Sequence, residues 1–451
     1  MPITMSATMC AAGALLLGAA QAAEQPGQAT TLTSTAKEMI SFRHQKHSWI
    51  TDDGRYQLLY NSGVNGNALQ LSTSTDGVSW MPSVVLIDTD EASSADGSLN
   101  AGLLSVVYST ARHGISFAPL KYDPAKGWKI KGPGQVVRPG SENDDKTFKH
   151  KPAYLPSLVE DHAGNFWAVF LEQTLTKETK STQTALAVLR LYYRPKDGST
   201  WSDTGMTFGD SANPNRALNA PKLSGRLVRT PDSIGLVFAD GADIWWAQLP
   251  KGSAWNDKWQ ASTLLIQGTP DSEADKDPYA SHFSTATDDQ GNIHLVYADA
   301  KIPYYRRFNA SVEDGGPAWS MNSVAFSKEP MNTGYPEVSH LGGSNIAVVF
   351  NAQVPDPTTG NNKLSNLRVW QSATRGGPNG GQTGWVCTDV LTHAKAGENP
   401  SQYQHMRNEM PASVPATVQP LVLLQHQPTT STYEARGYQF PVSGINGCKQ
   451  Q

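Results

Sequence analysis

A loose repeated unit runs through most of this chain of 451 residues and constrains its fold more than any other feature. Each unit reads as an apolar strand, a turn, two further strands and a loop that ends in tryptophan, and the clearest copies start at His47, Tyr154 and His282. The weaker copies start near Leu99, Asn219, Tyr335 and Glu409. The tryptophans that close successive units are Trp80, Trp128, Trp201, Trp259, Trp319 and Trp385, and the final unit ends without one. The pattern predicts about seven short units of four strands each.

A unit of this kind needs neighbours, because one twisted four-stranded sheet cannot cover both of its own faces. Sheets that stack around an axis bury those faces, and the tryptophans then pack between adjacent sheets. The sequence therefore predicts an all-β protein, a β-propeller of seven blades with four antiparallel strands per blade. Six blades are the alternative, since the copies near Leu99 and Asn219 are faint. One stretch, "TSTAKEMISF" (33–42), is a weak candidate for a helix.

The N-terminus has the pattern of a secretory signal peptide. Residues 1–22 hold an apolar core from Met9 to Ala20 and end in Ala20-Gln21-Ala22, a small-residue cleavage pattern, although no Lys or Arg precedes the core. We expect residues 23–451 to form a single propeller domain that is secreted or periplasmic, and a disordered apolar tail is the alternative for residues 1–22. No other segment approaches the roughly 18 uninterrupted apolar residues of a membrane span.

Charge and cysteine content narrow the expected partners and compartment. The net charge of -4 and the pI near 6.3 give no basic footprint, which argues against nucleic acid as the main partner. Cys10 would leave with the signal peptide, so Cys387 and Cys448 remain as one candidate disulfide. This bridge would close a loop of about 60 residues, which is worth roughly 4 kcal/mol in the chain-entropy model. Two unpaired buried thiols are the alternative.

Short motifs resemble those of known secreted propellers. "STDGVSW" (74–80) resembles the Asp-box, or BNR, hairpin of sialidase-like propellers, in which Ser, Asp, Gly and Trp build a turn, and "KDGSTW" (196–201) is a degenerate copy. "DDQGNIHLVYAD" and "EDHAGNFWAVFLE" are similar to a strand-turn-strand phrase of propellers that act on polysaccharides, including ulvan and rhamnose–glucuronate lyases. The resemblance implies the fold and a carbohydrate partner. Asp-boxes lie at structural turns, so they carry no information on chemistry.

The starts of the inner strands are expected to share one face. A strand rises about 3.3 Å per residue, so the chain that leaves this face at His282 returns to it near Asp299, and Tyr304 opens the next strand there. The same counting brings polar residues of other blades to a depression around the axis, where a ligand site is expected. The expected catalytic residues are His47, His282 and Tyr304. The expected substrate-binding residues are Arg43, His44, Arg306, Tyr335, Glu337, Arg407 and Glu409.

Three functions fit these residue types. The first is β-elimination on a uronate-containing glycan, which needs a cation at the carboxylate, a base for the C5 proton and an acid for the leaving oxygen. The histidines, Tyr304 and Arg306 offer these groups, and the resemblance to propeller lyases implies the same residue types. A sialidase-type hydrolase is the first alternative, through the arginines Arg43, Arg306 and Arg407 and the pair of Tyr335 and Glu337, although the Ile-Pro that follows the first such arginine in sialidases is absent. A glycan-binding propeller without catalysis is the second.

Each candidate residue also has a purely structural explanation. His282 could satisfy a backbone group at a strand start. Tyr304 and Tyr305 point to opposite faces of one strand, so at least one of the rings is expected to pack. Glu337 and Glu409 could be surface residues or could pair with groups of neighbouring blades. Sequence alone leaves these explanations open.

No cofactor is expected, and a structural calcium ion is the alternative. The acidic loops "DTDEASSADGS" (88–98), "SENDD" (141–145) and "DSEADKD" (271–277) lack the ligand spacing of an EF-hand loop. The chain also lacks a glycine-rich phosphate loop.

Overall fold

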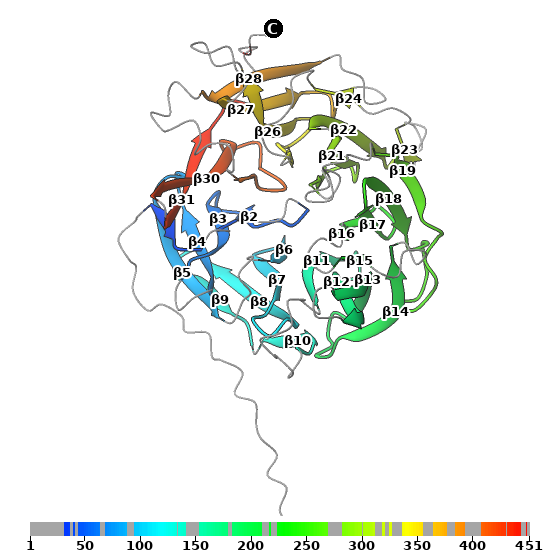
Figure 1. Cartoon of the computed structure of the whole chain (residues 1–451). Helices are drawn as coiled ribbons and strands as arrows, with labels where there is room; N and C mark the ends of the chain where they lie inside the picture. Colours follow the sequence, from blue (N-terminus) through cyan, green and yellow to red (C-terminus); the bar gives the residue numbers. More distant parts are fainter. Residues whose placement is uncertain are drawn as a thin grey trace, which may run out of the picture.

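Seven antiparallel sheets surround a common axis, which confirms the expected seven-bladed β-propeller (Figure 1). The structure is a computed structural model. It describes residues 31–36, 39–40, 44–63, 68–87, 94–132, 134–140, 153–178, 183–209, 216–217, 223–268, 282–299, 301–311, 318–320, 324–326, 336–354, 364–376, 384–392, 407–429, 431–442 and 448. No helix occurs in these ranges.

Each blade has four strands that follow one another from the axis outwards, and three blades carry a short additional strand. Blade 1 consists of β2 (Ser48–Ile50), β3 (Tyr56–Asn61), β4 (Ala68–Ser74) and β5 (Trp80–Ile87). Blade 2 consists of β6 (Ala95–Asn100), β7 (Leu103–Ser109), β8 (Ile115–Asp123) and β10 (Gln135–Arg138), with β9 (Gly127–Ile130) beside β8. Blade 3 consists of β11 (Ala153–Glu160), β12 (Phe166–Glu178), β13 (Gln183–Arg194) and β14 (Ser202–Phe208), with β15 (Arg216–Ala217) beside β13.

The remaining blades repeat this order. Blade 4 consists of β16 (Leu223–Arg229), β17 (Ile234–Asp240), β18 (Asp243–Gln248) and β19 (Thr263–Ile266). Blade 5 consists of β20 (Ser284–Thr287), β21 (Ile293–Asp299), β22 (Ile302–Asn309) and β23 (Ala318–Trp319), with β24 (Val324–Ala325) beside β22. Blade 6 consists of β25 (Glu337–His340), β26 (Ile346–Val354), β27 (Leu364–Ser372) and β28 (Trp385–Leu391). Blade 7 consists of β29 (Asn408–Glu409), β30 (Leu421–Thr429), β31 (Thr432–Gln439) and β1 (Leu32–Ser34).

The ring closes through the N-terminal strand β1, which is the outermost strand of blade 7. Leu32 pairs with Ala435 and Ser34 pairs with Tyr433 in antiparallel register. The expected helix over residues 33–42 is therefore wrong at its start. Leu32 and Ser34 are buried while Thr33 is exposed, and this alternation suits a strand rather than a helix.

The closing tryptophans pack between blades, as predicted. Each lies in, or packs against, an apolar cluster that its own blade shares with the preceding blade. Trp80 lies between blades 7 and 1, Trp128 between blades 1 and 2, and Trp259 between blades 3 and 4. Trp201, Trp319 and Trp385 take the same place in blades 3, 5 and 6.

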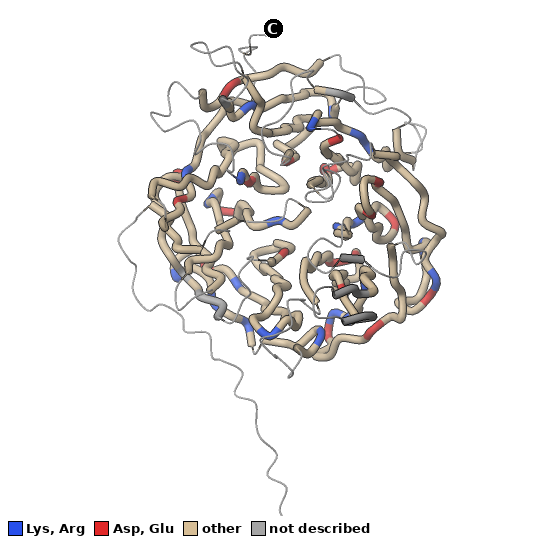
Figure 2. Tube along the Cα trace, viewed as in Figure 1, with Lys and Arg blue, Asp and Glu red and all other residues tan. Residues whose placement is uncertain are grey.

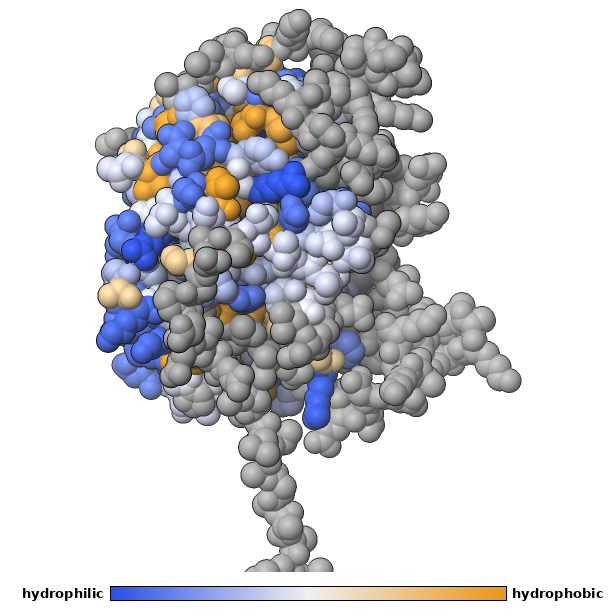
Figure 3. Space-filling model, turned by 90° about the vertical axis from the view of Figure 1, so that its left-hand side faces the viewer, coloured by the Kyte–Doolittle hydropathy of each residue, from blue (hydrophilic) through white to orange (hydrophobic). Residues whose placement is uncertain are grey.

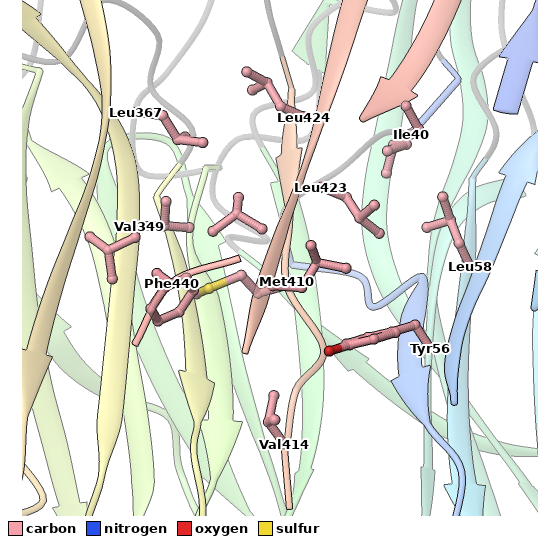
Figure 4. Close-up of a cluster of buried hydrophobic side chains, with 14 of the residues drawn as sticks. Ile40, Tyr56, Leu58, Val349, Leu367, Met410, Val414, Leu423, Leu424 and Phe440 are labelled. Carbon is pink, nitrogen blue, oxygen red and sulfur yellow. The ribbon is translucent and has the colours of Figure 1, made fainter. Parts of the chain in front are cut away.

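The cluster that joins blades 6, 7 and 1 shows how the ring is sealed (Figure 4). The Met410 side chain lies beside the Phe440 ring, with Val349 on one side and Leu423 above them. The Tyr56 ring reaches in from blade 1, and its hydroxyl donates a hydrogen bond to the Gln419 carbonyl at 2.5 Å. The first and last blades are therefore held by apolar contact as well as by strand pairing.

The hairpin over residues 74–80 has the hydrogen bonds that its sequence suggests. The Asp76 carboxylate accepts the Val78 and Ser79 amides at 2.8 and 2.7 Å. The Gly77 amide donates to the Ser74 hydroxyl at 2.8 Å, and Gly77 takes a φ of 74°, which favours glycine. Trp80 follows and is fully buried. This turn is structural, in keeping with its position between the two outer strands of blade 1.

A disulfide joins Cys387 of β28 to Cys448, with a sequence separation of 61. The Cys448 amide also donates to the Cys387 carbonyl at 3.4 Å. The bridge therefore fastens the C-terminal tail to blade 6 rather than to blade 7, in which the last strand lies.

The outer edge of the ring is largely hydrophilic on the side of β31 and β5, with small separate apolar patches (Figure 3). Within the described ranges, no helix has the length and apolarity needed to cross a membrane. The candidate leader, residues 1–22, lies outside those ranges.

Candidate functional site

The propeller has two faces, and the inner strands distinguish them. We call the face where these strands begin the start face and the one where they finish the end face. The predicted site is on the start face. Arg43 and Tyr335 belong to it but lie outside the described residues, as do residues 88–93, 141–152, 218–222, 269–281, 327–335 and 393–406, which lead into the inner strands.

A short stretch before β2, His44–His47, crosses the axis and is here called the axial segment (Figure 1). All four of its side chains are buried. The Gln45 amide donates to the Pro156 carbonyl at 2.7 Å and to the Ser94 hydroxyl at 3.3 Å, which ties the segment to blades 3 and 2. The axial segment thus fills the centre of the ring near the start face.

Lys46 ties the axial segment to the opposite side of the ring. Its ammonium donates to the Glu337 carboxylate of blade 6, to the Ser284 hydroxyl of blade 5 at 2.8 Å and to the Val338 carbonyl at 3.4 Å. These three acceptors use all three N–H groups of a lysine. Both charges are fully buried, so the pair is neutral as a unit and shielded from solvent.

His47 makes the corresponding contact with blade 7. Its amide donates to Glu409 Oε1 at 3.0 Å, and its Nδ1 lies 3.5 Å from Glu409 Oε2. Burial alone would raise the pKa of Glu409, but the hydrogen bonds and charge of His47, with the charge of Lys46, outweigh it and hold this pKa below its ordinary value. The Glu409 carboxylate therefore stays ionised and serves as an acceptor.

A third buried pair, Asp96 with Arg226, completes the centre of the ring. The Asp96 carboxylate also accepts the Lys46 amide at 2.8 Å and the Leu158 amide at 2.7 Å. Ser157 donates to Asp96 at 3.1 Å and accepts from the Leu227 amide at 3.0 Å. Side chains of one inner strand therefore bind the backbone of the next, and acidic and basic positions meet around the axis (Figure 2).

The structure thus brings His44, His47, Glu337 and Glu409 together, as the sequence predicted, but in the interior of the ring. His282 is half-buried and directly precedes Phe283, whose ring lies 5.9 Å from that of His44. The contacts of His47 and the two glutamates are with the protein itself, so their clearest role is to hold blades together.

Two other predicted residues, Tyr304 and Arg306, lie away from the axis, whereas Arg407 directly precedes an inner strand. Tyr304 stacks on Tyr297, with ring centroids 5.5 Å apart, and packs between blades 4 and 5. The Arg306 guanidinium donates to the Ser320 carbonyl at 2.7 Å and to the Leu265 carbonyl, also between these blades. Arg407 precedes β29, and its carbonyl accepts the Gln425 amide at 2.7 Å.

A cavity of about 340 Å³ lies on the end face, around the axis, and is here called the axial pocket. Its walls are the last residues of the inner strands of blades 1 to 5, together with Ala412 and Ser413 of blade 7. The volume suits a small ligand or one unit of a larger one. Sequence reasoning missed this site because it followed the strand starts. A signal was present, since successive inner strands run to Asn100, Glu160, Arg229 and Asp288.

Four charged residues line the axial pocket, and three of them already have polar partners. Arg226 pairs with Asp96, Asp288 pairs with Arg375 at 3.1 Å, and Glu160 accepts the Asn100 amide group at 3.0 Å. Arg229 is exposed, and no hydrogen bond or ion pair joins its side chain to any residue that the structure describes. The unpaired cation on the pocket wall is therefore Arg229.

Asp288 is positioned by a turn that blade 3 repeats. Its carboxylate accepts the Gln290 and Asn292 amides, both at 2.9 Å, and lies 3.3 Å from His294 Nε2. In blade 3 the equivalent Asp161 accepts the Trp167 indole N–H at 2.9 Å. Burial alone would raise the pKa of Asp288, but the hydrogen bonds from His294 and Asn292 hold it well below its ordinary value of 3.8. The pocket wall therefore keeps an ionised carboxylate here.

Trp49 forms an apolar part of the pocket wall. It lies against Gly97 of the next blade, where a Cβ atom would come within 2.6 Å of the indole. Gly97 is thus needed for close approach, and any larger residue would push the indole from its place.

Metal binding finds no support in the described part of the chain, where no three His, Cys, Asp or Glu side chains are grouped to hold an ion. The acidic loops 141–145 and 271–277 lie outside that part, as do residues 88–93. Asp96, from the loop predicted over 88–98, is committed to Arg226 instead.

Comparison with known proteins establishes no family for this chain. No family model and no curated protein sequence matches the chain, so membership of a BNR or Asp-box family is not established. Solved structures with a similar fold include the polysaccharide lyase Uly1, at 11% identity and a TM-score of 0.45 over 92% of this chain and 98% of that chain. They also include a mutant of the Aleuria aurantia lectin in complex with Fucα1-6GlcNAc, at 12% identity and a TM-score of 0.42 over 78% of this chain and 96% of that chain. Similarity at this level carries no argument.

Proposed function

We propose that the protein is a secreted propeller that binds an acidic carbohydrate in the axial pocket of its end face. The observation that carries the proposal is Arg229, an exposed cation that lies on the wall of a polar cavity and has no partner among the described residues. A guanidinium in this setting is suited to a carboxylate, which it can bind through two parallel hydrogen bonds. Export would follow from the N-terminal leader.

The other wall residues suit the rest of a sugar ring. Glu160 has acceptor capacity beyond its bond from Asn100, so it can take hydrogen bonds from hydroxyl groups. Exposed Ser413 and half-buried Thr287 offer further hydroxyls, and Trp49, which is 6% exposed, forms an apolar part of the wall. A uronate unit, with one carboxylate and several hydroxyls, fits this set better than a neutral apolar ligand.

Binding without catalysis is the form of this proposal that the pocket supports best. Among the described residues, no His, Tyr or Lys lines the pocket, and Asp288 is held ionised by its partners. An acid to protonate the leaving oxygen in β-elimination is therefore not evident there, although the carboxylates of Glu160 and Asp288 could accept a proton.

The test is to incubate the mature protein with alginate, polygalacturonate, sialyllactose and dextran, and to measure both binding and products. We expect binding of the uronate polymers, weaker binding of dextran and no new product. An unsaturated uronate, seen by its ultraviolet absorbance, would show elimination instead, and free sialic acid would show hydrolysis. Absence of any uronate binding would refute the proposal.

β-Elimination at the start face is the second candidate. The observation in its favour is that the His44 ring lies 5.9 Å from the ring of Phe283, which follows His282 in the chain, and that His44 and His47 belong to the same buried axial segment. If the incubation yields unsaturated uronate, His282→Ala should abolish its formation while Arg229→Gln leaves the rate of cleavage unchanged. The opposite pattern would move the chemistry to the axial pocket.

A further inference from the structure

Trp255 is an exposed aromatic residue in a chain that buries most of its tryptophans. Its exposed fraction is 37%, whereas Trp80, Trp128 and Trp167 are at most 3% exposed. The large apolar side chains that are exposed in the described part of the chain are Val78, Val136, Trp255 and Leu264, so Trp255 is the aromatic member of this set. An exposed indole of this kind needs an explanation.

The Trp255 ring is held flat against a second aromatic ring. It stacks on Tyr193 of blade 3, with centroids 5.4 Å apart and planes 7° from parallel. Tyr193 is itself fixed by Trp167, which meets it edge-on at 4.8 Å. One face of the indole is therefore covered, while the side chain remains more than one-third exposed.

The surroundings of Trp255 are polar. Asn256, Asp257 and Lys258 follow it and are all exposed. The Asp257 carboxylate accepts the Ala254 amide at 2.6 Å, which closes a turn around the tryptophan. An open aromatic face next to donors and acceptors is the arrangement that binds the apolar side of a sugar ring and its hydroxyls together.

Blade 4 carries both Trp255 and Arg229 towards the end face. β16 ends at Arg229, and β18 runs in the same direction, because β17 pairs antiparallel with both of them. Trp255 lies in the segment that follows β18. Adjacent strands are about 4.8 Å apart, so the ends of β16 and β18 are roughly 10 Å apart. Trp255 lies seven residues beyond the end of β18 and stacks on blade 3, so a ligand that reaches it from the axial pocket has to be longer than this strand-end spacing.

We propose that Trp255, supported by Tyr193, is a second carbohydrate subsite, and that the ligand is an oligosaccharide or polysaccharide that extends from the axial pocket across blade 4. The inference rests on the proposed function, because the axial pocket holds one end of the ligand. It adds that the protein recognises a chain of sugars rather than a single unit.

The test compares galacturonic acid with its tetramer and hexamer by isothermal titration calorimetry. Trp255→Ala should weaken hexamer binding about tenfold and leave galacturonic acid binding unchanged. Trp255→Phe, which keeps a ring, should recover most of the hexamer affinity. Leu264→Ala is the matched control, because Leu264 is an exposed apolar residue of the same blade and its loss should change neither affinity.

The outcomes separate this inference from the proposed function. Equal hexamer affinity in the wild type and Trp255→Ala, with binding lost in Arg229→Gln, would refute the second subsite and leave the axial pocket in place. Equal loss of monomer and hexamer binding in Trp255→Ala would also refute it, since that would show a general structural effect. Failure of the wild type to bind any of the three sugars would refute the proposed function and the inference with it.

Discussion

Lys46 is the residue on which the centre of the ring depends most, since it joins blades 5 and 6 to the axial segment. Replacing it by methionine keeps the length of the side chain but leaves the Glu337 carboxylate buried without its cation. We expect Lys46→Met to lower the free energy of unfolding by about 3–5 kcal/mol, measured by urea denaturation.

The matched control is Lys251→Met. Lys251 and Asp232 form an ion pair at 2.7 Å, with side chains 74% and 51% exposed. Loss of this surface pair should cost at most about 1 kcal/mol. The double variant Lys46→Met with Glu337→Gln should recover part of the loss, because no buried charge is then left alone. Equal effects of the two lysine substitutions would contradict a central role for Lys46.

His294 is expected to make stability depend on pH. Burial holds its pKa below the ordinary value of 6.5, although the hydrogen bond and charge of Asp288 oppose this shift. The unfolded chain therefore takes up the proton first as the pH falls, so the free energy of unfolding decreases from pH 6.5 down to the pKa of the folded protein. The lowered pKa of Asp288 adds a further loss only below its ordinary value of 3.8.

His294→Gln removes this dependence while keeping a hydrogen bond to Asp288. The design follows blade 1, where Gln57 occupies the equivalent position and donates to Thr51 at 3.2 Å. We expect the thermal midpoint of the variant to change less with pH than that of the wild type just below pH 6.5. An unchanged slope in the variant would show that another group titrates.

The sequence predicted where individual site residues lie along their strands, but it did not predict their burial or their partners. Counting along strands brought Glu337 and Glu409 to the centre of the ring, and the structure has them there. Their burial and their partners depend on the axial segment, which crosses from a neighbouring blade. The surroundings of Tyr304 depend likewise on a second blade, since its ring packs against the apolar cluster between blades 4 and 5. The sequence of a single strand predicts neither the burial of the two glutamates nor the packing of Tyr304.

At the level of strands and turns, most of the structure follows from local sequence. Period-two alternation and turns of the form Asp-x-x-Gly-Asn located the inner strands of blades 3 and 5, and the tryptophans located the outer strands. β1 could not be predicted, because it has only three residues and pairs with a strand about 400 residues later in the chain. Local patterning holds no information on a partner at that separation.

The disulfide between Cys387 and Cys448 is expected to stabilise the fold, and this contribution can be measured. Replacing both cysteines by serine should lower the free energy of unfolding by about 4 kcal/mol, as expected for a loop of this length. Dithiothreitol should lower the denaturation midpoint of the wild type by a similar amount and leave that of the double variant unchanged. A midpoint of the wild type that does not respond to the reductant would mean that the bridge adds no stability.

For the whole molecule, the repeat predicted the ring and its seven blades, but the position of the accessible site required the structure. The axial segment fills the centre near the start face, and the described cavity opens on the other face. The alternation of apolar and polar residues is the same at both ends of a strand. It therefore could not show which face of the propeller carries the accessible site. Glu160 and Arg229 lie at the ends of inner strands. They indicate a ligand site only once the structure shows that the axial segment fills the centre of the ring near the start face.

The most direct test of the account is the affinity of the axial pocket for an acidic sugar. Tetragalacturonate is titrated into the wild type, into Arg229→Gln and into the control Arg112→Gln, which removes an exposed arginine from a loop on the start face. Loss of a charge-assisted hydrogen bond predicts that Arg229→Gln binds at least about tenfold more weakly, while Arg112→Gln binds like the wild type. Equal affinity in the wild type and Arg229→Gln would contradict the account.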